Sequence, residues 1–192
     1  MIGDWRRQFA QGDFPFLYAQ ISSYKASPEE YWGMLRDAQR RTLAVANTAM
    51  AVTLDVGDRE NVHPADKQTV GHRLALAARA LSYGEDVRHS GPLFRQATTE
   101  SGGMHVYFTA AGGKLAARGG TVEGFELAGA DRHFVPATAK IDADGASVTV
   151  TSSQVTTPVY VRYAWPNAPD ATLMDGAGLP ASTFTSEAVP AH

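Results

Sequence analysis

The stretch Phe14-Pro15-Phe16-Leu17-Tyr18-Ala19-Gln20-Ile21 decides the fold class, because it is a nearly continuous apolar and aromatic run behind Gly12-Asp13. Such a run is typical of a strand that is buried on both faces of a parallel sheet. Next comes Ser27-Pro28-Glu29-Glu30, a capping box with proline at the first helical position. It predicts a helix whose apolar residues recur at roughly helical spacing: Tyr31, Leu35, Ala38 and Leu43.

A second strand and helix follow. Ala49-Met50-Ala51-Val52-Thr53-Leu54-Asp55 predicts the strand, and Pro64 predicts the start of a helix that Gly84 ends. The apolar stripe of this helix is Val70, Leu74, Ala77, Ala78 and Leu81. The order strand, helix, strand, helix indicates an α/β layer with a parallel sheet over residues 1–89, too short to be a complete one.

The character of the chain changes near Gly91, where glycine-punctuated short strands take over. The predicted strands are residues 104–109, 122–127, 137–141, 147–151 and 158–163. Turns are predicted at Ala111-Gly112-Gly113, Arg118-Gly119-Gly120 and Asp142-Ala143-Asp144-Gly145. We expect an all-β part over residues 90–187, in the form of a small antiparallel β-sandwich, and a frayed tail at 188–192.

Composition excludes several classes of function. The chain has 192 residues, 44% of them hydrophobic, which suits a globular protein with a real core. A net charge of -3 and a pI near 6.0 argue against nucleic acid or an acidic membrane surface as a partner. This charge is more compatible with a small neutral or mildly polar ligand than with a polyanionic partner. No apolar run approaches the roughly 20 residues that span a bilayer, and the first residues lack the apolar core of a signal peptide.

Metal and thiol chemistry have no support in the sequence. The chain has no cysteine, which excludes disulfides, thiolate zinc sites and a cysteine nucleophile. Its histidines outside the stretch described next lack metal-ligand spacing, so we predict no metal site: His72, His89, His105 and His133.

The main candidate for catalysis is Asp58-Arg59-Glu60-Asn61-Val62-His63-Pro64. His63 should lie near the first turn of a helix, where the partial positive charge disfavours imidazolium and favours the neutral ring of a general base. Glu60 or Asp58 can orient the other ring nitrogen. Ligands of open α/β sheets bind beyond the carboxyl ends of the strands, where this loop should lie. The alternative is that His63 only caps its helix and both acids are solvated.

The other candidates come from the first strand and helix. Ser22 and Ser23 follow the first strand, so either is a conceivable nucleophile, although both also suit an ordinary loop. Gln20 and Trp32 can line an acyl or sugar pocket, with core packing as the alternative for Trp32. Without an activated serine, a histidine and an acid cannot form an acyl-enzyme. Three aromatic residues can stack on a sugar or belong to the sandwich core or rim: Tyr160, Tyr163 and Trp165.

Several longer segments carry a family resemblance. They include Asn47-Thr48-Ala49-Met50-Ala51-Val52-Thr53-Leu54-Asp55-Val56-Gly57-Asp58, Asn61-Val62-His63-Pro64-Ala65-Asp66-Lys67, Val161-Arg162-Tyr163-Ala164-Trp165 and Gly178-Leu179-Pro180-Ala181-Ser182-Thr183-Phe184. Together they resemble the C-terminal part of the sialate O-acetylesterases, a branch of the SGNH or GDSL-like serine hydrolases. The resemblance covers nearly the whole chain. It implies a partial SGNH-type parallel sheet with helices, followed by the β-sandwich.

The resemblance also implies a function and roles for residues. It implies an esterase that removes O-acetyl groups from sialic acid or other sugars without a cofactor, in a family that is often periplasmic or secreted. His63 matches the general base. Glu60 stands where the superfamily has its acid, in place of the more usual aspartate, and Asp58 matches a recurrent family position. The family's nucleophilic serine and oxyanion loops belong upstream of Met1, so the chain resembles half an active site.

Two functions therefore remain open. The first is a carbohydrate O-acetylesterase of the SGNH type, present as its C-terminal portion. The second is a noncatalytic module that gives sugar binding or an oligomer interface. Because an incomplete parallel sheet leaves an apolar edge, we expect a homo-oligomer or a complex in either case.

Overall fold

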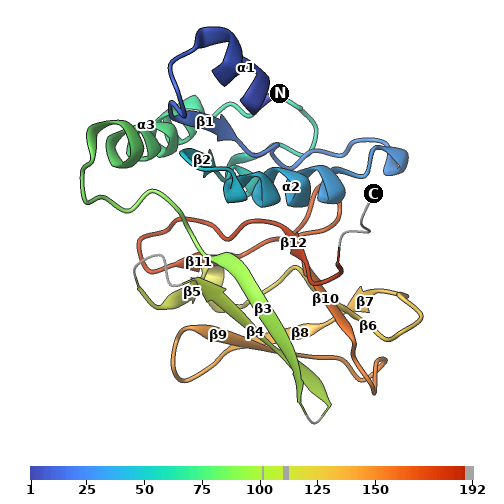
Figure 1. Cartoon of the computed structure of the whole chain (residues 1–192). Helices are drawn as coiled ribbons and strands as arrows, with labels where there is room; N and C mark the ends of the chain where they lie inside the picture. The colour runs from blue at the N-terminus through green and yellow to red at the C-terminus, as the bar shows by residue number, and fades with distance from the viewer. Residues whose placement is uncertain (101, 110–112, 189–192) are drawn as a thin grey trace.

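The computed structural model describes residues 1–100, 102–109 and 113–188 (Figure 1). Its first part holds α1 (Ile2–Phe9), β1 (Phe16–Ala19), α2 (Trp32–Arg41), β2 (Thr48–Ala51) and α3 (Lys67–Tyr83). Short 3-10 turns lie at Pro28–Glu30, Thr42–Ala44, Leu54–Val56 and Arg118–Gly120. The second part holds β3 (Leu93–Glu100), β4 (Gly103–Thr109), β5 (Leu115–Ala117), β6 (Phe125–Ala128), β7 (Val135–Pro136), β8 (Thr138–Ile141), β9 (Ser147–Thr151), β10 (Tyr160–Tyr163), β11 (Leu173–Asp175) and β12 (Phe184–Thr185).

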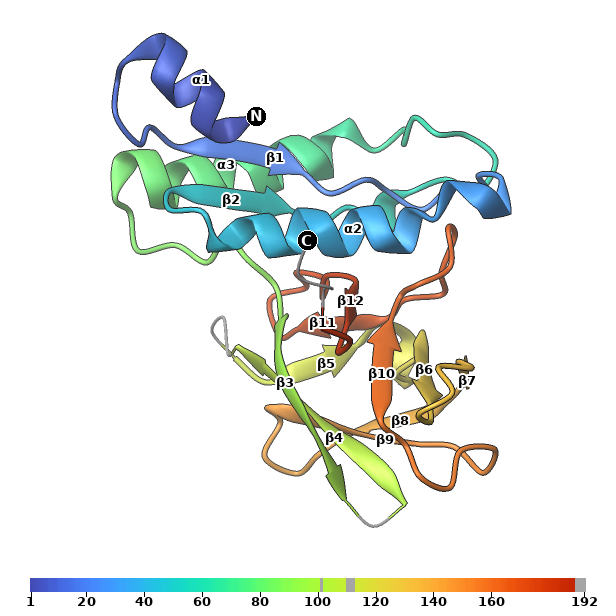
Figure 2. The same ribbon diagram turned by 45° about the vertical axis from the view of Figure 1, so that its right-hand side comes forward.

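Strands β1 and β2 form the predicted parallel pair, in register from Phe16 opposite Thr48 to Ala19 opposite Ala51. α3 contacts both strands. On α2, the carbonyl of Gln39 accepts a 2.8 Å hydrogen bond from the Tyr18 hydroxyl of β1. Contrary to prediction, β1 is only half-buried, because among the described residues it pairs with β2 alone. Both views place α1 on the far side of β1 from β2 (Figures 1 and 2).

Helix α2 buries a different face from the predicted one. Tyr31 adopts the left-handed conformation, with φ 49°, and separates the capped 3-10 turn Pro28–Glu30 from α2. The buried residues are Trp32, Gly33, Arg36 and Asp37, whereas Leu35 of the predicted stripe is 47% exposed. The reason is tertiary, since Arg36 reaches carbonyl oxygens of the β part that only this face can meet.

Helix α3 begins three residues later than predicted. Its N-cap is Asp66, which accepts a 2.9 Å hydrogen bond from the backbone N–H of Thr69. Pro64 therefore lies in the preceding loop. The helix ends at Gly84, with φ 67°, as predicted. Its predicted apolar stripe is confirmed, because each member is buried or half-buried: Val70, Leu74, Ala77, Ala78 and Leu81.

The β part is built from antiparallel sheets. One has four strands in the order β3-β4-β9-β8, another has four in the order β12-β10-β6-β7, and β11 pairs with β5. The tight turn between β8 and β9 is the predicted one, where Gly145, with φ 69°, donates a 2.9 Å hydrogen bond to the carbonyl of Asp142. Side chains of both four-stranded sheets share one core: Met104, Val106, Val148 and Val150 with Phe125, Leu127, Val161 and Phe184.

Prediction located some of these strands and missed others. The predicted strands at 104–109, 122–127, 137–141, 147–151 and 158–163 correspond to β4, β6, β8, β9 and β10. The sequence does not predict β3, because the outer residues of this strand are polar and exposed. It also does not predict four strands of two or three residues, which are too short to show an alternating pattern of apolar and polar residues: β5, β7, β11 and β12. Most of the predicted turn at 111–113 and of the tail at 188–192 lies outside the described residues.

One core runs through both parts of the chain. Met50, Val52 and Leu54, from β2 and the segment after it, belong to the same buried cluster as Val106 and Tyr163 of the β part. The predicted domain boundary between residues 89 and 90 stays a prediction. In the described part of the chain, no helix is both long and apolar enough to cross a membrane.

Candidate active site

The segments that follow β1 and β2 run side by side at the carboxyl ends of these strands (Figure 2). The backbone N–H of Gln20 donates to the carbonyl of Ala51 at 2.8 Å, and that of Lys25 donates to the carbonyl of Arg59 at 3.0 Å. Residues 58–63, called the His63 loop below, therefore lie at the sheet edge where open α/β folds bind ligands.

The base of the His63 loop is fixed to α3. The Asp55 carboxylate accepts two hydrogen bonds from Arg73, at 2.6 and 2.7 Å, and Arg73 also donates to the carbonyl of Val52 at 2.7 Å. Arg73 is 6% exposed, so these bonds are largely shielded from water. Gly57 approaches Ser23 so closely that a Cβ atom there would lie 2.5 Å from the Ser23 backbone. The loop thus starts from a rigid base.

The outer part of the loop is fastened by exposed charges. Glu60 forms an ion pair with Lys25, and Arg59 forms one with Asp170 of the β part, Nη2 to Oδ1 at 2.5 Å. Asp58 Oδ1 accepts a 2.8 Å hydrogen bond from the backbone N–H of Glu60. Both candidate acids therefore already have partners other than His63.

His63 itself is exposed in the loop. Its backbone N–H donates to Asn61 Oδ1 at 2.9 Å. Within the described part of the chain, its imidazole makes no hydrogen bond or ion pair with Asp58 or Glu60. The predicted position at the helix N-terminus is wrong, because α3 begins at Lys67 with Asp66 as its cap. Asp66 thus occupies the place predicted for His63, and hydrogen bonds from Thr69 lower the pKa of its carboxyl group.

The two candidate serines are buried, each 6% exposed. The Ser23 hydroxyl donates a 2.8 Å hydrogen bond to the carbonyl of Leu54, so it links the two segments at the sheet edge. A nucleophile has to meet its substrate, and this burial favours the interpretation of both as loop residues.

Gln20 and Trp32 lie between the two parts of the chain. Gln20 is 1% exposed, and its Nε2 donates to the carbonyl of Arg36 at 3.0 Å and to Ser182 Oγ at 2.8 Å. Trp32 is 6% exposed, and its Nε1 donates to Glu30 Oε2 at 3.0 Å. These contacts favour a packing role over the lining of an open pocket.

A groove beside the His63 loop went unnoticed in the sequence. Its volume is about 460 Å³, and its lining includes Lys25, Tyr31, Arg59, Trp165 and Asn167. Of the three aromatic candidates, only Trp165 lines it, while Tyr163 is buried in the core. No local pattern signals the groove, because its walls come from three separate segments of the chain.

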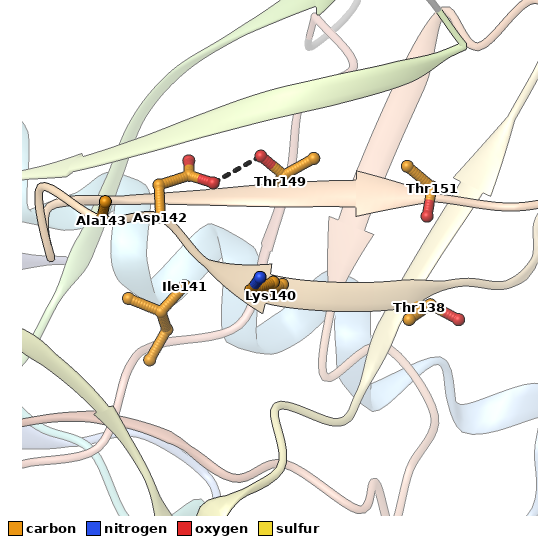
Figure 3. Close-up of a pocket in the computed structure, with 7 residues that line it drawn as sticks. All are labelled: Thr138, Lys140, Ile141, Asp142, Ala143, Thr149 and Thr151. Atoms are coloured by element: carbon orange, nitrogen blue, oxygen red, sulfur yellow. Dashed lines mark hydrogen bonds between the residues drawn. The ribbon is translucent and has the colours of Figure 1, made fainter.

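A second hollow lies on the β part, over β8 and β9, at the opposite end of the molecule from the His63 loop (Figures 1 and 3). Its volume is about 420 Å³, and Thr138, Lys140, Thr149 and Thr151 line it. The Thr149 hydroxyl donates to Asp142 Oδ1 at 2.5 Å, as Figure 3 shows. Asp142 of this lining pairs with His105 of β4, Oδ2 to Nδ1 at 3.5 Å. This pair lies away from the carboxyl ends of β1 and β2, where open α/β folds bind ligands, so the His63 loop remains the candidate site.

Comparisons with known proteins agree in sequence and in fold. No protein-family model matches the chain. Mouse sialate O-acetylesterase is 31% identical over 194 aligned residues, which cover 88% of this chain and 35% of the mouse protein. Human sialate O-acetylesterase is 39% identical over 113 residues, which cover 48% of this chain and 22% of the human protein.

A solved structure matches more fully. The crystal structure of a carbohydrate acetylesterase from Xanthomonas citri superposes with a TM-score of 0.92 at 42% sequence identity. The match covers 98% of this chain and 45% of that one. The chain thus spans about a third of the mouse relative and less than half of the bacterial one. By sequence and by fold, it belongs to the sialate O-acetylesterase family and matches the C-terminal portion of its members.

Proposed function

We propose that this chain supplies the acid and base half of an SGNH-type esterase that removes O-acetyl groups from sialic acid or other sugars. One observation carries the proposal: 98% of the chain matches a carbohydrate acetylesterase at 42% identity. The position of the His63 loop beyond the carboxyl ends of β1 and β2 supports it.

In the proposed reaction, a serine oxygen attacks the carbonyl carbon of the acetyl ester while His63 takes the serine proton. The C–O bond to the sugar breaks, the sugar oxygen takes the proton from His63, and an acetyl-serine remains. His63 then removes a proton from water, which attacks the acetyl-serine and releases acetate and free serine. The chain's own part in this scheme is proton transfer at His63, with no cofactor required. The serine would come from polypeptide outside these 192 residues.

The orienting acid remains a choice between Glu60 and Asp58. Glu60 is the acid that the superfamily pattern favours, and its pairing with Lys25 is exposed, so exchanging this partner costs little. Asp58 accepts one hydrogen bond from the backbone N–H of Glu60 and has a second oxygen for an imidazole. Glu60→Gln and Asp58→Asn separate the two roles, because only the orienting acid should lower the turnover number strongly when neutralised.

The test is hydrolysis of an aryl acetate by the purified chain, combined with labelling by a serine-directed phosphonate and mapping of the adduct. Loss of turnover in His63→Ala supports the base assignment, and persistence of turnover in that variant contradicts it. An adduct on Ser22 or Ser23 would show that the nucleophile lies within this chain. Absence of both turnover and adduct would rule out a standalone enzyme, and addition of the missing part of the fold should then restore activity.

The noncatalytic module remains a second candidate, favoured by the burial of Ser22 and Ser23. The edge of β1 that pairs with no strand among the described residues and an exposed apolar face on α2 suit an interface with another polypeptide, either a second copy or a partner. This face consists of Tyr31, Met34, Leu35 and Ala38. Light scattering with size-exclusion chromatography tests it, because Leu35→Glu should dissociate an assembly that uses this face.

A further inference from the structure

The groove beside the His63 loop is formed by three segments that converge at one end of α2 (Figure 2). Lys25 and Tyr31 come from the segment between β1 and α2, Arg59 from the His63 loop, and Trp165 from the end of β10. The volume of about 460 Å³ is within the range of small-molecule sites. Because Arg59 belongs to the His63 loop, a ligand in the groove would contact the loop that carries the proposed base.

The lining combines flat apolar groups with an open mouth. Tyr31 is 62% exposed, and Trp165 is half-buried. Pro28 and Pro166 add further apolar surface. Aromatic side chains offer the apolar faces that sugar rings pack against. The groove therefore has a platform for a ring, rather than the enclosed pocket that a wholly apolar ligand needs.

The rim carries both donors and acceptors. Lys25 is paired with Glu60, and Arg59 with Asp170. All four side chains are between 46% and 77% exposed, and such exposed pairs contribute little to stability. They can exchange one partner for a ligand hydroxyl, which donates to a carboxylate and accepts from a cation. Since each cation has its own carboxylate, the rim has no surplus of positive charge for an anion.

Polar contacts fix the walls before any ligand arrives. Asn167 Nδ2 donates to the carbonyl of Ser27 at 2.8 Å, and its Oδ1 accepts from the backbone N–H of Trp32 at 3.0 Å. Arg36 donates to the carbonyl of Ala164 at 3.0 Å. These bonds join the Trp165 segment to the start of α2, so the platform is held in place and binding requires little reorganisation.

We propose that this groove binds the neutral pyranose ring of an acylated sugar, with Tyr31 and Trp165 as the platform and Lys25 and Arg59 as the hydroxyl partners. The identity of the ring as the sugar of the ester substrate rests on the proposed function. The binding of a neutral sugar is independent of the proposed function, and it is measured separately from hydrolysis.

The experiment is an NMR titration of the full 192-residue chain. N-acetylglucosamine is the neutral probe, and N-acetylneuraminic acid is the anionic one. The neutral sugar should shift the indole N–H of Trp165 and the side-chain amide of Asn167. Tyr31→Asn, which suits the left-handed backbone at that position, and Arg59→Gln should each weaken binding about fivefold to tenfold.

The chain offers matched controls for both substitutions. Tyr83→Asn removes an aromatic that is 76% exposed on α3, and Arg79→Gln breaks an exposed pair with Glu85. Neither residue lines the groove, so both variants should keep the wild-type affinity.

Three results would overturn the proposal: no shift of the Trp165 indole N–H in a folded chain, wild-type affinity in both Tyr31→Asn and Arg59→Gln, or salt-sensitive binding of the anionic probe alone. Binding that survives in a hydrolytically inactive His63→Ala variant supports the groove independently of catalysis. Turnover of aryl acetates without sugar binding would leave the proposed base intact and reject the groove.

Discussion

The guanidinium of Arg36 donates a 3.0 Å hydrogen bond to the carbonyl oxygen of Ala164, and this contact joins α2 to the β part in the interior of the protein. Arg36 is 0% exposed, and burial lowers its pKa to about 10, so it stays charged at neutral pH. A buried charge is tolerated only where acceptors surround it. Further acceptors lie nearby: the carbonyls of Trp165, Pro166 and Asn167, and Thr183 Oγ1.

Arg36→Lys should lower the free energy of unfolding by about 3 kcal/mol, because an ammonium group cannot reach acceptors spread around a planar guanidinium, and buried carbonyls lose partners. Urea unfolding measures the loss. Arg79→Lys, at an exposed pair, is the control and should change stability by less than about 0.5 kcal/mol. A small effect at Arg36 would mean that water replaces the lost donors.

Asp55→Asn should destabilise the chain by about 3 kcal/mol, because it leaves the buried Arg73 without its charged partner. The side chains of this pair are 7% and 15% exposed. Glu85→Gln breaks the Arg79 pair, whose side chains are 49% and 43% exposed, and should cost less than about 1 kcal/mol. Amide hydrogen exchange should also rise in the His63 loop of Asp55→Asn, since Asp55 fixes its base. Equal losses in both variants would contradict the burial argument.

Gly33→Ala should cost about 1–3 kcal/mol, because the new methyl group would lie 2.3 Å from the carbonyl oxygen of Trp165 and would force α2 away from the β part. Gly71→Ala is the matched control near the start of α3, where a Cβ meets nothing within 4 Å. That substitution should stabilise by roughly 0.5–1 kcal/mol through helix propensity. Thermal unfolding of the two variants should therefore shift in opposite directions.

Tyr18 makes stability depend on pH in the alkaline range. Burial raises the pKa of its hydroxyl from 10.0 to about 12. Between these values the unfolded chain loses the Tyr18 proton while the folded chain keeps it. The contribution of Tyr18 to the free energy of unfolding is therefore full below pH 10 and is lost as pH rises towards 12. Tyr18→Phe should flatten the fall in urea midpoint between pH 10 and 12, relative to wild type.

The remaining alkaline dependence of Tyr18→Phe should include Tyr163, whose pKa burial also raises, and Arg36, whose lowered pKa of about 10 acts in the opposite direction. Tyr160→Phe is the control, since Tyr160 is only half-buried and lies on the same strand as Tyr163. A fall in midpoint that is identical in wild type and Tyr18→Phe would show that the hydroxyl titrates alike in both states.

Local sequence patterns predicted the order of strands and helices from β1 to α3, because their signals act over a few residues. The apolar run around Phe16, the capping box at Ser27 and the glycine at 84 mark a strand, a helix start and a helix end within one or two turns of chain. The stretch from Asp58 to Pro64 likewise pointed to the sheet edge where its loop lies. The start of α3 was misplaced because Pro64 and Asp66 are both good first-turn signals, and the hydrogen bond to Thr69 selects Asp66.

Tertiary structure alone decided which surfaces meet. Glu60 pairs with Lys25 across 35 positions of sequence, and Arg59 with Asp170 across 111, which no local period encodes. The buried face of α2 was set in the same way, since Arg36 finds its acceptors in a loop more than a hundred residues away. The sequence by itself therefore determined the longer elements from β1 to α3, part of the β strands and the candidate loop, whereas packing between distant segments decided the partners of its acids and the groove beside it.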